Sequence, residues 1–414
     1  MSGFHYVGGE LHVEGVALST VAERHGTPCY VYSRELLTAN YRAYERALAG
    51  MPSLVCYALK ANSSLAVVDL FGRLGSGFDI VSEGELARVV AAGGDVRKVV
   101  FSGVGKSDRE MEAALAAGVL CINVESASEL GHLAAVASRL GVRAPVSFRV
   151  NPEVDPGTHP YIATGLGESK FGVAFAEAAA LYRHAAALPS IEIRGIDMHI
   201  GSQLVDLAPI RDAATRVLAL VDALAADGIH LGHVDVGGGI GIRYRDEVPP
   251  ALDDYARMLR ELFRGRRETL LVEPGRRLVG DAGVLLTRVR YLKGGTPRDF
   301  AIVDSAMNDL LRPSLYDAWH AIDPVRPRQG ETRRYDVVGP VCESADFLGL
   351  DRALVLAEGD LLAIRGAGAY AMSMSSNYNS RPRACEVMVD GGDTLEIRRR
   401  ETIADLYAQE RRLR

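Results

Sequence analysis

The sequence contains no apolar run of the roughly 20 residues that a helix needs to cross a bilayer. Its first residues, Met1–Tyr6, show no basic segment followed by an apolar stretch, so no secretory signal peptide is expected. An excess of one charge is lacking as well: 47 basic and 53 acidic residues give a net charge of −6. Such a mild balance gives no reason to expect nucleic-acid or membrane partners.

Cysteine is also scarce, and its spacing excludes the common metal-binding patterns. The five cysteines are odd in number and widely spread, with no CxxC pair and no Cys/His cluster. This pattern predicts free thiols in a reducing cytoplasm and no metal centre. Cys29, Cys56 and Cys121 stand in apolar runs that predict burial, whereas Cys342 stands in a turn-like segment.

What the sequence does contain is a regular alternation of short apolar runs with longer amphipathic ones. The chain has 414 residues, 48% of them hydrophobic, which suits a soluble protein of two domains. Between residues 54 and 273, eight runs read as strands buried on both faces, which predicts parallel pairing. The runs are Leu54–Lys60, Phe78–Val81, Val99–Ser102, Cys121–Val124, Val146–Val150, Gly195–Ile200, His233–Val236 and Leu270–Glu273. Eight strand–helix units predict a (β/α)8 barrel, and a doubly wound open sheet is the alternative.

After residue 280 the pattern changes to strands separated by turns. The predicted strands are Val284–Leu292, Phe300–Asp304, Tyr335–Val338, Ala353–Arg365 and Cys385–Val389. At the other end of the chain, Phe4–Gly15 reads as a β-hairpin around Gly8-Gly9. We therefore predict a barrel domain over residues 29–278 and a mostly β domain built from residues 1–28 and 279–414. The long polar stretch Asn151–Gly172 is the best candidate for a mobile lid.

Polar residues recur where the predicted barrel strands end. They are Lys60, Asp79, Arg149, His199, the glycines 237–239 and Glu273. The carboxyl ends of barrel strands converge on one face, and active sites are built there. An unrelated scatter of polar residues would not be so consistent, which favours the barrel over the open sheet.

Lys60 is the most informative of these residues because it closes an apolar run. A lysine among apolar neighbours can lose its proton and attack a carbonyl to form a Schiff base. The alternative for this segment alone is a structural lysine that reaches out to water.

The glycine run Gly237-Gly238-Gly239 follows an apolar strand and could hold a phosphate through backbone N–H groups. It lacks the G-x-G-x-x-G dinucleotide pattern, because Ile242 occupies the last glycine position, so a single phosphate remains. Gly275 and Arg276 could add donors there. Glu273 could hold a proton on a pyridine nitrogen, or form a structural pair with an arginine.

Six motifs taken together resemble the diaminopimelate decarboxylases, a branch of the fold-type III pyridoxal-phosphate decarboxylases with an alanine-racemase-like barrel. They are Tyr57–Asn62, His199–Gln203, Gly237–Gly239, Glu273–Arg276, Cys342–Ser344 and Ser375–Ser380. The similarity runs over essentially the whole chain. It implies the cofactor pyridoxal 5′-phosphate, an amino-acid substrate, and a head-to-tail homodimer in which Cys342 and Glu343 enter the partner's barrel.

The resemblance also assigns roles to residues. Lys60 would be the Schiff-base lysine, His199 would stack on the cofactor ring and Glu273 would face its nitrogen. The phosphate would be surrounded by Ser202, Gly238, Gly239, Gly275, Arg276 and Tyr370. The substrate would meet Arg276, Arg312, Tyr316, Glu343 and Tyr370. Asp79 and Arg149 match neighbouring positions, and Cys342 or Lys60 would return a proton to the α-carbon.

Among related activities, the residues favour decarboxylation of meso-diaminopimelate to L-lysine. A carboxylate such as Glu273 at the ring nitrogen argues against racemisation of the alanine-racemase type, and the long β domain argues against a non-catalytic cofactor carrier. Ornithine-type decarboxylases place an aspartate after the cysteine, where this chain has Glu343. Arg312 adds a cation beside that anion, as a distal amine plus carboxylate would require. A decarboxylase of ornithine, lysine or arginine is the alternative.

Overall fold

The computed structural model describes residues 3–155, 170–296 and 298–413. The chain divides into two compact units. The barrel unit comprises Tyr41–Ile242 and Val248–Arg277, and the β unit comprises Met1–Asn40, Arg243–Glu247 and Leu278–Arg414. Most of the predicted lid, residues 156–169, lies outside the described residues. The expected domain limits at residues 28/29 and 278/279 stay predictions.

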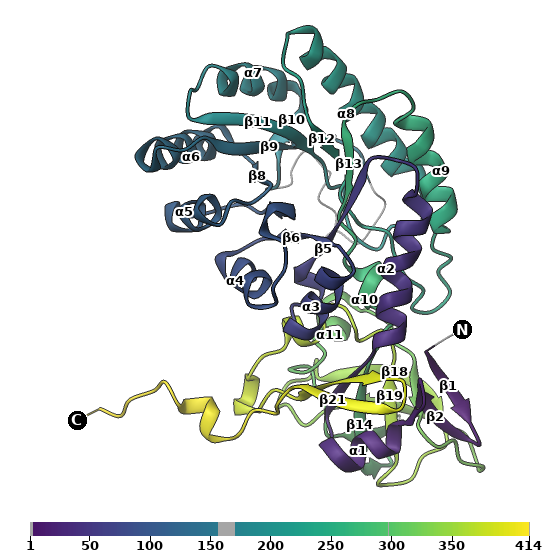
Figure 1. The fold of residues 1–414 in the computed structure, drawn as a ribbon. Helices are drawn as coiled ribbons and strands as arrows, with labels where there is room; N and C mark the ends of the chain where they lie inside the picture. The colour runs from purple at the N-terminus through teal and green to yellow at the C-terminus, as the bar shows by residue number, and fades with distance from the viewer. Residues whose placement is uncertain (1–2, 156–169, 297, 414) are drawn as a thin grey trace. The chain divides into compact units, whose positions relative to one another are not determined.

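The barrel unit is built on eight parallel strands that close into a ring (Figure 1). They are β5 (Ser53–Ala58), β6 (Gly77–Ile80), β7 (Val99–Phe101), β8 (Cys121–Val124), β9 (Ala144–Asn151), β11 (Ile191–Asp197), β12 (His233–Asp235) and β13 (Thr269–Val272). Each strand pairs with the next, and the ring closes where β13 pairs with β5, Leu271 opposite Leu54. The predicted (β/α)8 barrel is confirmed, and the open sheet is excluded because no barrel strand is left at an edge. The short β10 (Val173–Ala174) adds to β9.

Helices follow the strands and cover the outside of the ring (Figure 1). They are α3 (Leu65–Arg73), α4 (Glu83–Ala91), α5 (Asp108–Ala117), α6 (Ala127–Leu140), α7 (Phe175–Ala186), α8 (Ala208–Ala226) and α9 (Leu252–Leu262). Three of them begin at a serine whose hydroxyl accepts a backbone N–H of the first turn: Ser82, Ser107 and Ser126. Such caps satisfy donors that the helix itself cannot, so the sequence fixes where each helix starts. The helices α2 (Arg34–Leu48) and α10 (Arg276–Val279) contain two of the points at which the chain changes unit, and the other two bound Arg243–Glu247.

The β unit draws strands from both ends of the chain, as predicted. Its central strand β14 (Gly283–Lys293) pairs with β4 (Cys29–Ser33) and with β15 (Asp299–Val303). The large sheet is completed by β16 (Ile322–Pro324), β17 (Arg333–Val338), β18 (Phe347–Leu354), β19 (Leu361–Ile364), β20 (Cys385–Asp390) and β21 (Asp393–Arg398). The predicted hairpin is present as β1 (Phe4–Val7) and β2 (Glu10–Val13). It is followed by β3 (Val16–Ala17) and α1 (Leu18–His25).

One predicted strand of the β unit is wrong. Ala353–Arg365 is not continuous: β18 ends at Leu354, and β19 begins at Leu361. Between them the Asp360 side chain accepts the backbone N–H of Ala357 at 2.8 Å, and Gly359 has a φ of +89°. The residues Glu358-Gly359-Asp360 therefore form a turn. Apolar residues on both sides of this turn made the sequence read as one continuous strand.

Burial of the cysteines follows the expectation. Cys29, Cys56 and Cys121 are buried, Cys342 is exposed, and all five thiols are free. Within the described part of the chain, no helix is long and apolar enough to cross a membrane.

Candidate active site

The mouth of the barrel begins with Lys60 and Asp79. Lys60 lies on a single 3-10 turn (Leu59–Ala61) directly after β5, and not in the strand itself. Its Nζ lies 2.5 Å from Oδ2 of Asp79, which is fully buried on the neighbouring β6. The pairing of Ala58 with Asp79 between the two strands places these side chains together. A buried carboxylate thus holds the lysine head group at the barrel end while the lysine side chain stays partly accessible.

A second group at the mouth consists of three buried carboxyl groups. Carboxyl oxygens of Asp197, Asp235 and Glu273 lie within 4.8 Å of one another, from the ends of β11, β12 and β13. Burial raises the pKa of Asp197 to about 7, an effect that Arg149 partly offsets. Burial, followed by the neighbouring aspartates, also raises the pKa of Glu273 well above its usual range. The cluster therefore holds protons near neutral pH.

Each member of this cluster has a buried oxygen without a hydrogen-bond partner among the described residues: Oδ1 of Asp197, Oδ2 of Asp235 and Oε1 of Glu273. Glu273 differs from the two aspartates in standing directly before the Pro274-Gly275-Arg276 segment. Its side chain is 5% exposed, and its Oε1 has no hydrogen-bond partner among the described residues. A buried polar atom without a partner is costly in a folded protein. A ring N–H at this position would satisfy it.

Arg149 brings positive charge to the same strand ends. Its guanidinium lies 3.8 Å from Glu125 and 4.0 Å from Asp197, and its side chain is almost completely buried. The pairing of β9 with β11 sets Arg149 directly beside Asp197. Arg149 therefore balances acidic groups at the mouth of the barrel.

The glycine loop leaves no room for side chains. A Cβ on Gly238 would lie 2.0 Å from the carbonyl oxygen of Glu273, and a Cβ on Gly239 would lie 2.3 Å from that of Gly201. Gly237 and Gly239 also have φ values of +68° and +99°, which L side chains rarely adopt. The backbone at this end of β12 therefore carries no side chains over these glycines, which lets backbone N–H groups approach an anion closely.

His199 and Arg276 border the same loop. The backbone N–H of Gly238 donates to Nδ1 of His199 at 3.3 Å, so this ring nitrogen is an acceptor. Burial lowers the pKa of His199 well below its usual value, so the ring is neutral. Arg276, the first residue of α10, donates to the hydroxyl of Ser202 at 3.0 Å. Gly275 packs against the Cβ atoms of Ala58 and Ala61, next to Lys60.

These residues fit pyridoxal phosphate. An amine, an unsatisfied buried carboxyl oxygen, a neutral imidazole, a bare glycine loop and an arginine–serine pair come together at one end of one barrel. Each matches a different part of that cofactor: its aldehyde, its ring nitrogen, its ring face and its phosphate.

The remaining predicted residues belong to the β unit. Arg312 and Tyr316 bound the short helix α11 (Arg312–Tyr316), and Arg312 is buried. Cys342 and Glu343 are exposed: the Cys342 N–H donates to Oδ1 of Asn379, and Glu343 accepts the Tyr378 hydroxyl at 3.2 Å. Tyr370 has an unusual φ of +55° for a residue with a side chain.

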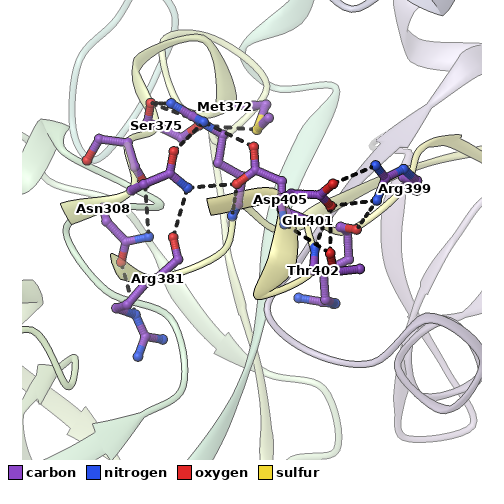
Figure 2. A network of polar contacts seen from close by, with 12 residues as sticks. Asn308, Met372, Ser375, Arg381, Arg399, Glu401, Thr402 and Asp405 are labelled. Carbon is purple, nitrogen blue, oxygen red and sulfur yellow. Dashed lines mark hydrogen bonds and ion pairs between the residues drawn. The ribbon is translucent and has the colours of Figure 1, made fainter. Parts of the chain in front are cut away.

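The loop that carries Tyr378 and Asn379 is held by a polar network (Figure 2). Glu401 accepts from Asn377 at 2.7 Å and from the Arg383 guanidinium at 3.1 Å. On the other side, Asn308 donates to the Ser376 carbonyl and accepts from Arg381. The segment near the C-terminus thus fixes the loop against which Cys342 and Glu343 lie.

Sequence reasoning missed Asp197 and Asp235 as members of the site. Both lie in apolar strands, and their register pairs them directly. The available signal was an aspartate at the strand end in two neighbouring strands, with Asp79 one residue before the end of β6 as a third example.

Comparison with known proteins agrees with this geometry. Residues 34–280 match the family model "Pyridoxal-dependent decarboxylase, pyridoxal binding domain". The chain is 62% identical to the diaminopimelate decarboxylase of Pseudomonas aeruginosa over 99% of both proteins. The chain belongs to the diaminopimelate decarboxylase family.

Solved structures of the family have the same fold. Diaminopimelate decarboxylase from Helicobacter pylori, complexed with L-lysine, superposes with a TM-score of 0.92 at 44% identity, covering 95% of this chain and 99% of that one. The enzyme from M. jannaschii in complex with L-lysine gives a TM-score of 0.94 at 36% identity, over 100% and 99% of the two chains. A lysine/ornithine decarboxylase from Vibrio vulnificus, at 22% identity and a TM-score of 0.80, shares the fold alone.

Proposed function

We propose that this protein is a diaminopimelate decarboxylase, which uses pyridoxal 5′-phosphate to convert meso-2,6-diaminopimelate to L-lysine and CO2, the last step of lysine biosynthesis. The observation that carries the chemistry is the buried carboxyl group of Glu273, whose Oε1 finds no hydrogen-bond partner in the described part of the chain, at the same barrel end as Lys60. The family membership supports the substrate, because the relatives of known name carry that activity in their names.

Lys60 would hold the cofactor through its Nζ, and Glu273 would accept the ring N–H at Oε1 and so keep the ring nitrogen protonated. Ser202, Gly238, Gly239, Gly275, Arg276 and Tyr370 would bind the phosphate, and His199 would lie against the ring. When bound, pyridoxal phosphate accepts the electron pair that the departing carboxylate leaves behind. Asp79 would keep the Lys60 amine in place, with Arg149 balancing the charge around it. Lys60 and Cys342 both remain candidates for returning a proton to the α-carbon.

The substrate's far end distinguishes this reaction from its nearest alternative. Meso-diaminopimelate has an amine and a carboxylate there, whereas ornithine, lysine and arginine used as substrates lack the distal carboxylate. Arg312 would offer a planar fork for that carboxylate and Glu343 an anion for the amine, and Tyr316 and Tyr370 would be further substrate-binding residues. We further propose a cytoplasmic homodimer, with each active site completed by Cys342 and Glu343 of the other subunit. Free cysteines support the cytoplasmic location.

The test is CO2 release from meso-diaminopimelate, lysine, ornithine and arginine by the purified holoenzyme. Wild type should prefer diaminopimelate, and Arg312→Lys should lower its kcat/KM by some thirty- to a hundredfold. That loss corresponds to about 2–3 kcal/mol for a charged, hydrogen-bonded pair. Rates with substrates that lack the distal carboxylate should change little. A wild-type preference for ornithine or lysine, or an equal loss on every substrate, contradicts the assignment.

A further inference from the structure

Arg312 is held by two side chains that the mechanism above does not use. It is 6% exposed at the start of α11, and a buried guanidinium needs partners that fix its head group. The described contacts of Arg312 include a histidine in its plane and an aromatic ring on its face. Both partners, like Arg312, belong to the β unit.

The in-plane partner is His320, which is completely buried. Its Nε2 lies 3.0 Å from Nη1 of Arg312, and its Nδ1 lies 2.7 Å from the carbonyl oxygen of Arg365. A guanidinium only donates hydrogen bonds, so Nε2 must accept. Nδ1 therefore carries the hydrogen and donates to the Arg365 carbonyl, which makes His320 a neutral ring.

The backbone fixes the position of that histidine. The N–H of Arg365 donates to the carbonyl of Ala321 at 2.8 Å, next to the pairing of β16 with β19. The imidazole is thus attached to the end of a strand pair through Nδ1, and it presents Nε2 to Arg312.

The partner on the face is Tyr244. The Arg312 Cζ lies 4.5 Å from the centre of the Tyr244 ring, within the range of a cation–π contact. The same ring meets His320 edge to face, with centroids 5.1 Å apart. Gly366 makes room for it, because a Cβ there would lie 2.8 Å from the Tyr244 ring.

One hydrogen bond in the plane and one ring on the face together define the orientation of a planar group. Neither His320 nor Tyr244 adds a negative charge, so both orient the guanidinium without neutralising it. A guanidinium oriented in this way can offer its planar fork to a carboxylate.

We propose that His320 and Tyr244 are positioning residues that hold the Arg312 guanidinium to receive the carboxylate of an α-amino-acid head group. The inference rests on the proposed function, in which Arg312 reads the distal end of the substrate. The inference extends the proposed function by naming the side chains that make Arg312 selective for the distal carboxylate.

The product offers a test without turnover. Decarboxylation at one end of diaminopimelate leaves the other end intact, so L-lysine keeps the distal amine and carboxylate. Cadaverine is the same molecule without any carboxylate. The ratio of their dissociation constants, measured on the holoenzyme by titration calorimetry, therefore reports the distal carboxylate contact alone.

The key variants are His320→Phe, which keeps a ring but removes both nitrogens, and Tyr244→Leu, which removes the ring. Each should weaken L-lysine binding about tenfold or more, as expected for losing a bond to a charged group, and should change cadaverine binding less than about twofold. KM for diaminopimelate should rise more than kcat falls. His320→Gln can still accept a hydrogen bond and should restore part of the L-lysine affinity. His184→Phe, at an exposed position on α7, is the matched control.

Several results would overturn the proposal. Wild-type discrimination in both His320→Phe and Tyr244→Leu would show that neither residue positions Arg312. Equal losses for both ligands, with a lowered melting temperature, would mean a merely structural role. If His320→Phe does not fold, the ratio of the L-lysine and cadaverine dissociation constants is measured on Tyr244→Leu and His320→Gln instead, and the same outcomes apply. Failure of the proposed function looks different: wild type itself would then bind both ligands equally, and Arg312→Lys would not change the ratio.

Discussion

Glu273 illustrates how residue-scale surroundings set a catalytic property. Its carboxyl group lies beside Asp235 and Asp197, and burial, followed by the charge of these neighbours, raises its pKa. Beside these acidic neighbours, the protonated form of Glu273 is favoured unless a positively charged group lies next to the carboxyl group. A pyridinium nitrogen at Oε1 would supply that charge and stabilise the ionised carboxylate.

Glu273→Gln removes the ionisable group while keeping the shape of the side chain. We expect kcat to fall about a hundredfold or more, corresponding to roughly 3 kcal/mol of transition-state stabilisation, because an amide cannot maintain a protonated ring. Cofactor affinity should fall much less. Steady-state kinetics at saturating cofactor measure the effect, with Glu261→Gln on the exposed surface of α9 as the control. Near-normal turnover would contradict the role of Glu273 as the partner of the ring nitrogen.

Asp197 gives a pH-dependent prediction. Burial raises its pKa to about 7, so the folded protein keeps a proton that the unfolded chain loses near pH 4. The stability contributed by this group is therefore fully present below about pH 4 and is lost as the pH rises to about 7. In the cofactor-free protein, Asp197→Asn should be more stable than wild type at pH 8, by on the order of 2–4 kcal/mol, and less so at pH 5.

Urea unfolding of both proteins at the two pH values measures this difference, and Asp212→Asn on the exposed surface of α8 should show no such trend. A gain that is the same at pH 5 and pH 8 would show that Asp197 is ionised in the folded state.

The sequence indicates residues such as Lys60 and Glu273 because a charge at the end of an apolar run is conspicuous. It does not indicate Asp197 or Asp235 as a cluster, because their proximity depends on the register of β11 with β12. The same holds for Tyr244 and His320, which are 76 residues apart in the sequence numbering and meet only through the β-unit fold.

At the scale of elements, the glycine loop after β12 is the most constrained segment of the barrel mouth. Gly238 packs so closely on the end of β13 that a methyl group would overlap the Glu273 carbonyl oxygen. The chain must shift to admit any side chain, and a shift moves the N–H groups of the loop.

Gly238→Ala should therefore lower cofactor affinity by more than about tenfold, since precise placement of the loop N–H groups is lost. The melting temperature should fall as well. Titration of the cofactor-free protein with pyridoxal phosphate measures the affinity. Gly131→Ala provides the contrast: Gly131 lies in α6 with open space around it, and alanine there should stabilise the protein by about 0.5–1 kcal/mol. Unchanged cofactor affinity in Gly238→Ala would exclude a tight anion cradle.

Helices and strands could be predicted from the sequence where the local patterns agree with one another. Most residues of the barrel strands are apolar, and β8 has the predicted bounds, Cys121–Val124. Ala353–Arg365 failed because apolar residues on both sides outweigh a three-residue turn in a sequence pattern. The apolar run at Cys29 was visible in the sequence and forms β4. Its pairing with β14 and β20 was not visible, because no local pattern encodes such a long-range choice.

At the scale of the whole molecule, the division into two units was visible in the sequence as a change of pattern. Which residues cross between the units was not: Arg243–Glu247 is flanked by barrel residues and yet belongs to the β unit. Such a short excursion has no compositional signature. This segment matters because it contains Tyr244, whose ring contacts the Arg312 guanidinium.

The proposed sharing of active sites between subunits gives the last prediction. Lys60 belongs to the barrel unit and Glu343 to the β unit, where it is exposed on a loop beside Tyr378. If each site takes Lys60 from one subunit and Glu343 from the other, Lys60→Ala and Glu343→Ala proteins are each inactive alone. A mixed dimer then has one intact site and one that carries both changes.

Random exchange in a symmetric dimer makes half of the dimers mixed, so activity should return to about a quarter of wild type. The experiment mixes the two variants under conditions that allow exchange and follows CO2 release from meso-diaminopimelate. Mass spectrometry of differently tagged subunits confirms that exchange has occurred, and unmixed variants provide the baseline. Because a mixed dimer cannot contain an intact site if both residues come from the same subunit, exchange without any recovery of activity would place Lys60 and Glu343 in one subunit's site.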